Sequence, residues 1–463
     1  MSWSFVPSDD VARIRARLDH PVVDSDGHLI EFLPLVRDFV AEEAGPSVAA
    51  DLDRIIGGPP VLDAMPVETR RAKGLSRSPW WGLPTENTLD RATAMFPKLF
   101  CQRLDELGID FAVVYPTFGL VVTAFAGDEL RRAMARALNR YYAEVYGPYR
   151  DRLAPVACIP CFTPAEALDE LDHALGLGLR AVMLAGVIPR PVPGADGVRW
   201  LDTLGHEATY DYEPLWAALE RHDVAATFHA SGMGWGSRIS TSNYVYNHIG
   251  NFAAAGEATA RSLLFAGVPI RHPQLRFAFQ EGGVAAAASL AADVIGHWEK
   301  RNTAAIGRYD PAALDRSLLG SLFDDFASGP VAGMRARLEE GLGFLSQPGT
   351  AADDEFAASG ITGRADVERV FSRQFHFGCE ADDPLNALAF ADGVVPGGLR
   401  AVFASDIGHW DVPDARAVLV EAWEGVEHGA LSEQDFRAFV FGNAVSLWGR
   451  SFFAGTAVEG SVA

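Results

Sequence analysis

The motif Asp26-x-His28, followed by Glu31, is the first group of residues in the chain whose types could do chemistry. Two apolar residues, Val22 and Val23, precede it and indicate a buried β-strand. Because side chains two apart on a strand share a face, a carboxylate and an imidazole would project together. Such a pair can supply half of a divalent-metal site. A turn built on Asp-Gly, with a packed histidine, is the alternative.

Further acidic residues and histidines stand at the ends of other short apolar runs. Buried carboxylates repel one another unless a cation offsets their charge, so a metal is the simplest reason for several of them to converge. We therefore predict a metal site whose ligands come from these ends: Asp26, His28, His229, Glu281 and Asp406. Capping of a helix by Asp406 and a hydrogen bond from Glu281 to the following Gly-Gly turn are the alternatives.

The same residues allow one or two ions. Three carboxylates carry more negative charge than one divalent ion needs, and oxygen-rich ligation with histidines suits iron or manganese. Glu31, His376 and His409 are the candidates to complete the ligands of a second ion. With one zinc or manganese ion, Glu281 or His409 would instead serve as general base or acid.

Short apolar strands alternate with helices along the chain, which predicts βαβ units and a parallel sheet. Eight such strands favour a closed (β/α)8 barrel, whose active site lies at the carboxyl ends of the strands. No Gly-x-Gly-x-x-Gly follows the first strand, which argues against a dinucleotide-binding sheet. The strands are expected at 22–28, 110–116, 154–160, 178–184, 224–229, 275–281, within 370–380 and at 401–406.

We expect one domain over residues 1–463, an α/β barrel with two insertions. A helical and loop insertion over the site occupies 32–108, and a helical insertion occupies 284–366. A loop rich in Pro and Gly is expected over 185–212.

The first insertion carries a basic cluster beside two tryptophans, which is unusual in so acidic a chain. Its residues are Arg70, Arg71, Lys73, Arg77, Trp80 and Trp81. One interpretation is a solvated loop with a hydrophobic anchor. The other is a substrate-binding patch that holds phosphates or stacks on an adenine.

The composition excludes several classes of function. A net charge of −22 argues against partners such as nucleic acids and anionic membranes, which need a basic surface. No signal peptide or membrane-spanning run is present, so a cytoplasmic protein is expected. The four scattered cysteines, including Cys158-x-x-Cys161, favour structural thiols over a disulfide framework or a zinc site. Tyr141, Tyr142 and Tyr146 lie on one helix, where they form either a homodimer interface or part of the core.

Four motifs, in chain order, resemble the amidohydrolase-2 branch of the amidohydrolase superfamily: Asp26-x-His28, Thr227-Phe228-His229-Ala230, Phe279-Gln280-Glu281-Gly282-Gly283 and Phe403-Ala404-Ser405-Asp406-Ile407-Gly408-His409. The resemblance extends from about 20 to 450. It implies a metal-dependent barrel whose members are hydrolases, hydratases and non-oxidative decarboxylases of aromatic acids. It also implies that Asp26, His28, His229 and Asp406 are ligands. Two departures, Asp in place of the first His and Glu281 where decarboxylases place a catalytic His, weaken the decarboxylase interpretation.

The long form of the chain also resembles the barrel-fold nonheme diiron monooxygenases of the platensimycin and platencin diterpenoid hydroxylase type. The stretches that carry this resemblance are Trp80-Trp81-Gly82-Leu83-Pro84-Thr85, Asn87-Thr88-Leu89-Asp90-Arg91-Ala92-Thr93 and Gly296-His297-Trp298-Glu299-Lys300-Arg301-Asn302. It implies two irons per chain, O₂, an electron donor and a terpenoid-like substrate linked to coenzyme A. The basic cluster would then bind the coenzyme A phosphates. The sequence thus predicts a monooxygenase, with a single-metal hydrolase or decarboxylase as the alternative.

Overall fold

A computed structural model of the chain describes residues 3–56, 64–77, 86–195, 198–229, 239–343, 354–391, 393 and 395–462. Eight parallel strands form one sheet in the order β1-β2-β3-β4-β7-β8-β9-β10. Their bounds are β1 Val23–Leu29, β2 Phe111–Pro116, β3 Leu153–Ile159, β4 Ala181–Leu184, β7 Ala226–Phe228, β8 Phe277–Phe279, β9 Phe375–Glu380 and β10 Arg400–Ala404. Most of these strand residues are buried, as expected where helices cover the outer face of a parallel sheet.

The sheet closes where its first and last strands meet. The Asp406 amide donates to the Asp26 carbonyl at 3.0 Å, and the His28 amide donates to the Ile407 carbonyl at 3.0 Å. The Ser405 hydroxyl donates to the Asp24 carboxylate at 2.6 Å across the same junction. The predicted (β/α)8 barrel is confirmed, and its junction runs beside two of the predicted ligands.

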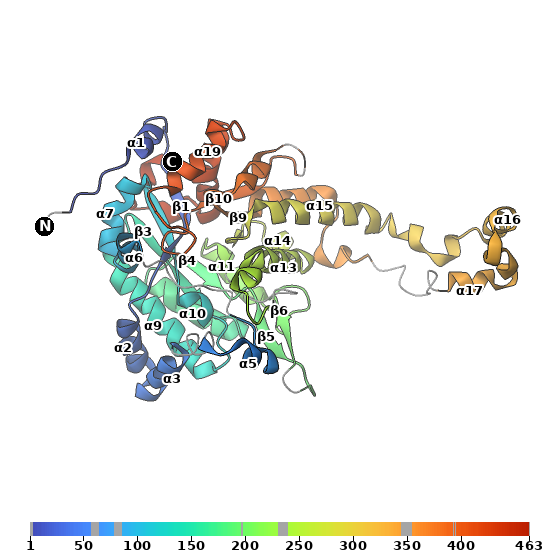
Figure 1. Cartoon of the computed structure of the whole chain (residues 1–463), viewed down its shortest axis with the longest axis horizontal. Coiled ribbons are helices and arrows are strands. Elements are labelled where there is room, and N and C mark those ends of the chain that lie inside the picture. Colours follow the sequence, from blue (N-terminus) through green and yellow to red (C-terminus); the bar gives the residue numbers. More distant parts are fainter. Residues whose placement is uncertain are drawn as a thin grey trace.

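The helices between β1 and β4 surround the first half of the barrel (Figure 1). They follow a short N-terminal helix, α1 Asp9–Arg15. Their bounds are α2 Leu33–Ala44, α3 Pro46–Ile56, α5 Val67–Ala72, α6 Thr88–Met95, α7 Pro97–Leu107, α8 Gly119–Val122, α9 Asp128–Tyr146 and α10 Pro164–Gly176. Tyr141, Tyr142 and Tyr146 of α9 are at most 1% exposed, so they are core residues and not an interface.

The second half continues with α11 Glu213–Arg221, α12 Tyr244–His248, α13 Asn251–Phe265 and α14 Val268–Arg271. After β9 and β10 the chain ends with α19 Val418–Glu427, α20 Glu433–Arg437 and α21 Asn443–Trp448. The loop expected over 185–212 contains an antiparallel pair, β5 Ile188–Pro191 and β6 Arg199–Asp202. This pair depends on contacts between segments eight residues or more apart, which the turn-rich composition does not reveal.

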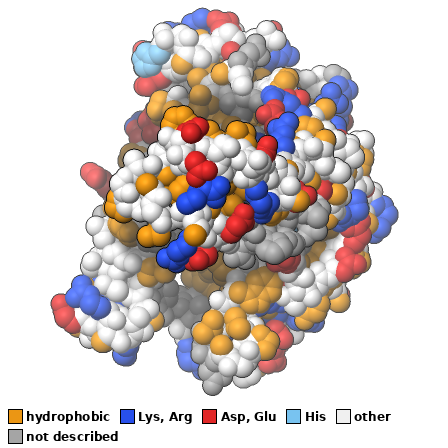
Figure 2. Space-filling view, turned by 90° about the vertical axis from the view of Figure 1, so that its right-hand side faces the viewer, with side chains coloured by type: hydrophobic (Ala, Val, Ile, Leu, Met, Phe, Trp, Pro, Cys, Tyr) orange, Lys and Arg blue, Asp and Glu red, His pale blue; other side chains and the backbone are white. Residues whose placement is uncertain are grey.

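An arm of helices between β8 and β9 projects from the barrel (Figure 1). It comprises α15 Gly283–Arg301, α16 Arg316–Phe326 and α17 Leu338–Leu342, and α18 Arg364–Arg369 leads back to β9. Hydrophobic and charged side chains are mixed on the face that looks along the arm (Figure 2). Several large apolar side chains of the arm are exposed, among them Leu318 and Phe326. In the described part of the chain, no helix combines the length and apolarity that crossing a membrane requires.

Candidate metal centre

Six acidic and histidine side chains converge at the carboxyl ends of the barrel strands. They are Asp26, His28, His229, Glu281, Asp406 and His409. The Nε2 atoms of His28 and His229 lie 3.2 Å apart. The carboxylates surround these two nitrogens: His28 Nε2 lies 3.2 Å from Asp406 Oδ1, and His229 Nε2 lies 3.4 Å from Glu281 Oε1. The structure therefore brings together the five residues that the sequence predicts as ligands.

A bulge in β1 places the first two residues of the cluster. The pairing of β1 with β2 shifts register between Asp24 and Gly27. Bulges of this kind redirect side chains beside active sites. A Cβ on Gly27 would lie 2.6 Å from the Asp24 carboxylate, so only glycine allows this close approach. Asp26 and His28 both reach the centre from this irregular strand.

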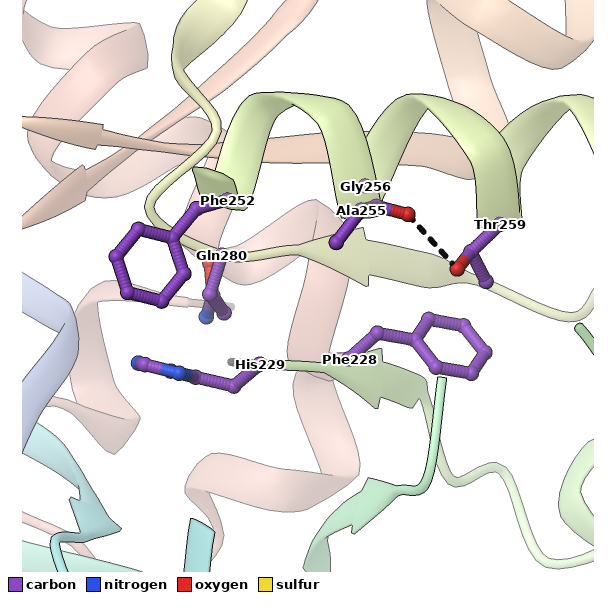
Figure 3. Close-up of a pocket in the computed structure, with 7 residues that line it drawn as sticks. All are labelled: Phe228, His229, Phe252, Ala255, Gly256, Thr259 and Gln280. Atoms are coloured by element: carbon purple, nitrogen blue, oxygen red, sulfur yellow. Dashed lines mark hydrogen bonds between the residues drawn. The ribbon is translucent and has the colours of Figure 1, made fainter. Parts of the chain in front are cut away.

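His229 follows the last residue of β7, and its ring points away from Phe228 (Figure 3). Phe228 packs toward Thr259 of α13, whereas Phe252 at the start of that helix lies beside the histidine ring. The centroids of the His229 and Phe252 rings are 6.1 Å apart in an edge-on arrangement. Helix α13 thus closes the apolar side of the centre.

Glu281 and Asp406 occupy equivalent places, each two residues beyond the end of a strand. Both have left-handed backbone conformations, with φ of 55° and 48°. Such conformations cost non-glycine residues on the order of 1–3 kcal/mol and are concentrated at functional sites. The fold accepts this strain at two carboxylates that face the same pair of histidines.

His409 is fixed by contacts at both ring nitrogens. Its Nδ1 lies 2.7 Å from Asp406 Oδ1, and its Nε2 lies 3.2 Å from the Thr117 hydroxyl. The ring stacks on His28 with centroids 3.6 Å apart. These contacts hold His409 at the edge of the centre, where the sequence predicted a general acid or base.

The buried carboxylates of the centre are not compensated by the described residues around them. Burial raises the pKa of Asp26 and of Asp406 well above the usual range, and burial lowers the pKa of His28 well below it. Both carboxylate oxygens of Asp26 are buried without a hydrogen-bond partner among the described residues. An unpartnered buried carboxylate is costly unless a cation compensates it. This donor set therefore fits a divalent metal ion.

The distances fit the ligands of one ion. Two donors bound at about 2.1 Å to one ion lie roughly 3.0–3.4 Å apart in octahedral or tetrahedral geometry. His28 Nε2 and Asp26 Oδ1 are 3.8 Å apart, and His229 Nε2 and Asp26 Oδ1 are 3.5 Å apart. With the 3.2 Å between the two histidines, these separations need only small adjustments around a single metal.

Glu31, a predicted ligand of a second ion, forms hydrogen bonds away from the metal centre. Its carboxylate accepts hydrogen bonds from the Phe118 and Gly119 amides at 2.8 Å each and from the Tyr142 hydroxyl at 2.9 Å. It is fully engaged in joining the end of β1 to α8 and α9. The structure corrects its assignment from metal ligand to structural residue.

Replacing Glu31 with alanine should lower stability without removing metal. Three buried donors would lose their acceptor, at about 1–3 kcal/mol each, so we expect a loss of about 3 kcal/mol or more. Urea unfolding would measure this loss, and elemental analysis of the folded variant would measure the metal. Loss of metal at unchanged stability would contradict the structural role.

His376, the other proposed ligand of a second ion, lies at the opposite end of the barrel. It is the second residue of β9, whereas His229, Glu281 and Asp406 lie beyond the last residues of their strands and His28 is the last but one residue of β1. Its Nδ1 contacts the Gln374 carbonyl at 3.1 Å, and its Nε2 contacts the Ser446 hydroxyl at 3.2 Å. Burial lowers the pKa of this histidine to about 3, so it is a neutral core residue.

The basic cluster is divided between side chains that contact the protein and side chains that face solvent. The Arg70 side chain is buried and donates to the carbonyls of Met65 and Thr241 at 2.7 Å each. The Arg77 side chain donates to the Ser242 carbonyl at 3.3 Å. These two arginines connect the first insertion to the segment after β7 and form no open phosphate site. Arg71 and Lys73 are exposed at the end of α5, and Trp80 and Trp81 lie outside the described residues.

The sequence did not assign a role to two residues that support the centre, Asp24 and Gln280. Asp24 accepts hydrogen bonds from the Asp26 and Ser405 amides at 3.1 Å each and so positions the neighbours of two ligands. Gln280 donates to the Ser25 carbonyl and the Tyr115 hydroxyl at 3.0 Å each. Asp24 precedes Asp26 by two residues, and that spacing was the one available signal.

Solved structures with similar folds include three enzymes. An amidohydrolase from Mycobacterium avium subsp. paratuberculosis K-10 is 22% identical, with 78% of this chain and 76% of that chain covered and a TM-score of 0.48. A 2,6-dihydroxybenzoate decarboxylase from Rhizobium is 14% identical, with 93% and 98% covered and a TM-score of 0.49. A 5-carboxyvanillate decarboxylase from Novosphingobium aromaticivorans, solved with manganese, is 14% identical, with 97% and 99% covered and a TM-score of 0.49. No curated protein matches the chain.

A family model described as amidohydrolase matches residues 24–341, more than half of the chain. The expectation of an oxidoreductase, a nonheme diiron monooxygenase acting on a coenzyme A-linked terpenoid, is wrong. The family model that matches the chain is described as amidohydrolase, a class of hydrolases and not of oxidoreductases. The geometry gives a physical reason as well, since Glu31 and His376 lie away from the centre and Arg70 is buried. The chain belongs to the amidohydrolase family.

Proposed function

We propose that this protein is a divalent-metal-dependent hydrolase whose centre holds one ion, manganese or zinc. The convergence of the His28 and His229 Nε2 atoms at 3.2 Å, among three buried carboxylates, carries the proposal. Asp26, His28, His229 and Asp406 would hold the ion. When bound, such an ion polarises a carbonyl group and lowers the pKa of water.

Glu281 is the residue we assign to proton transfer. Its Oε1 lies 3.6 Å from His28 Nε2 and 3.4 Å from His229 Nε2, so the carboxyl group borders the place where substrate and water meet. Its Oε2 is buried without a hydrogen-bond partner among the described residues. A carboxyl group with one oxygen at the centre and the other uncommitted can take a proton from water and return it to a leaving group.

His409 would position Asp406 and contact the substrate. Because Asp406 lies against its Nδ1 and Thr117 against its Nε2, the ring orientation is set from both sides. The charge around the centre favours a neutral or cationic substrate. Among the described residues, no Lys or Arg forms an ion pair with Asp26, Glu281 or Asp406, so an anionic substrate would face carboxylates with little compensation.

Product analysis in isotopically labelled water tests the reaction class. Manganese-loaded enzyme would be screened against amides, lactones and aromatic acids. A hydrolase adds one labelled oxygen to the acyl product. Release of CO₂ from an aromatic acid, with no labelled oxygen in the product, would overturn the proposal and favour a non-oxidative decarboxylase.

A further inference from the structure

A cavity of about 300 Å³ adjoins the metal centre and has acidic walls. Four of its lining residues are carboxylates, and two are glycines. The lining is Glu281, Gly282, Gly283, Glu380, Asp382, Asp383 and Pro384. Glu281 belongs both to this cavity and to the metal centre, so the two adjoin at this residue.

Two neighbouring strands create this acidic wall. Strands β8 and β9 pair in parallel with Phe279 opposite Phe377, so Glu281 and Glu380 emerge side by side at the carboxyl ends. Asp383 is held by the turn that follows, where its Oδ1 accepts from the Leu385 amide at 2.8 Å. Its Oδ2 lies 3.2 Å from the position of a Cβ on Gly283, which leaves no room for a side chain there.

The charge of the cavity is not balanced by the protein. No ion pair to Lys or Arg is formed by Glu281, Glu380, Asp382 or Asp383 within the described ranges; the only ion-pair contacts of these four are those of Glu281 with histidines of the centre. Helix α15 begins at Gly283, and its positive end supplies only about half an elementary charge. Four carboxylates outweigh that partial charge. The crowding of protein around Glu380, and then the charges of Asp411, Asp382 and Asp383, raise its pKa to about 7.

A buried polar atom of a residue that lines the cavity also indicates a ligand. The Glu281 side chain is only 6% exposed, and its Oε2 has no hydrogen-bond partner among the described residues. Its Oε1 already faces the metal centre. A buried carboxylate oxygen that accepts no hydrogen bond is energetically costly. A donor from a bound molecule would remove that cost.

We infer that this cavity binds a positively charged group of the substrate, an amine, amidine or guanidinium, while the bond to be cleaved lies at the metal centre. The inference rests on the proposed hydrolase function. A planar amidinium or guanidinium presents paired donors that match carboxylates. The four carboxylates would then act as the determinant of substrate charge.

Three probes of nearly equal shape test this inference: benzamidinium, benzamide and benzoate. Calorimetric titration of the manganese-loaded protein should show benzamidinium binding at least about tenfold more tightly than benzamide, a difference of about 1.4 kcal/mol. Replacing both Glu380→Gln and Asp382→Asn should abolish that preference without reducing bound manganese. Asp325→Asn removes one negative charge from the exposed arm, away from the cavity, and should leave the preference unchanged.

Several outcomes would overturn the inference. One is equal binding of benzamidinium and benzamide to the native chain. Another is a preference that survives in the double variant. Loss of manganese in that variant would show that the cavity belongs to the metal centre. The titration is repeated on metal-free protein, where a preference that depends on Glu380 and Asp382 remains measurable even if the native chain binds no metal and the proposed function fails.

Discussion

Replacing Asp406 with alanine should remove the metal and abolish turnover. Supporting residues around metal sites typically contribute 10–100-fold to metal affinity, and we expect loss of this carboxylate to exceed about 100-fold. Asp406 Oδ1 lies 3.2 Å from His28 Nε2 and 2.7 Å from His409 Nδ1, so its removal takes a donor from the middle of the cluster. Elemental analysis after dialysis and calorimetric titration with Mn²⁺ would measure the loss.

A nearby carboxylate provides the control for this variant. Asp414 lies eight residues further on and pairs with Arg416 at 2.7 Å on the surface. Asp414→Ala should keep both metal and activity. If Asp406→Ala retained a full complement of manganese, Asp406 would not be a ligand and the centre would have to be redefined.

Replacing Glu281 with glutamine should separate metal binding from catalysis. Asp26, His28, His229 and Asp406 remain to hold the ion, whereas the amide cannot accept and return a proton. General acid–base groups contribute about 10²–10⁴-fold, so we expect kcat to fall by that factor with bound manganese unchanged. Glutamine is nearly isosteric with glutamate, and it adopts the left-handed backbone at this position at similar cost.

Steady-state kinetics and metal analysis on the same preparation would test the role of Glu281. Loss of manganese together with activity would make Glu281 a ligand in place of a proton carrier. Unchanged kcat with unchanged metal would remove it from the reaction altogether.

The barrel and the strand-end residues could be predicted because both are local in sequence. Each strand is a short apolar run, and His229, Glu281 and Asp406 come directly after such a run. At most strand ends, the predicted boundary differs from the observed one by one to three residues. The apolar run and the hydrogen-bonded strand do not end at the same residue. The predicted strands end at His229, Glu281 and Asp406, whereas the observed strands end one or two residues before them, so these residues lie at the carboxyl ends of the strands in either case.

The errors concern residues whose partners lie far along the chain. Glu31 follows His28 closely, but the amides that it accepts from, Phe118 and Gly119, come nearly ninety residues later. His376 was placed on the correct strand and at the wrong end, because the start of β9 was not resolved within 370–380. Arg70 carries a charge that predicts contact with solvent or phosphate, yet its buried side chain donates to the nearby Met65 carbonyl and to the distant Thr241 carbonyl.

The number of carboxylates does not by itself fix the number of metal ions. Three negative charges suit two ions if each carboxylate is a ligand. We instead assign Glu281 to proton transfer, and a carboxyl group with that role is not needed as a ligand. The remaining donors, Asp26, His28, His229 and Asp406, are those that we propose hold one ion.

The number of metal ions per chain is the measurement that tests this account most directly. Protein stripped with a chelator, reloaded with Mn²⁺ and dialysed would be analysed for metal and for protein concentration. The proposed function predicts one ion per chain, bound by residues of β1 and of the segments after β7 and β10. Two ions per chain, or none, would contradict it.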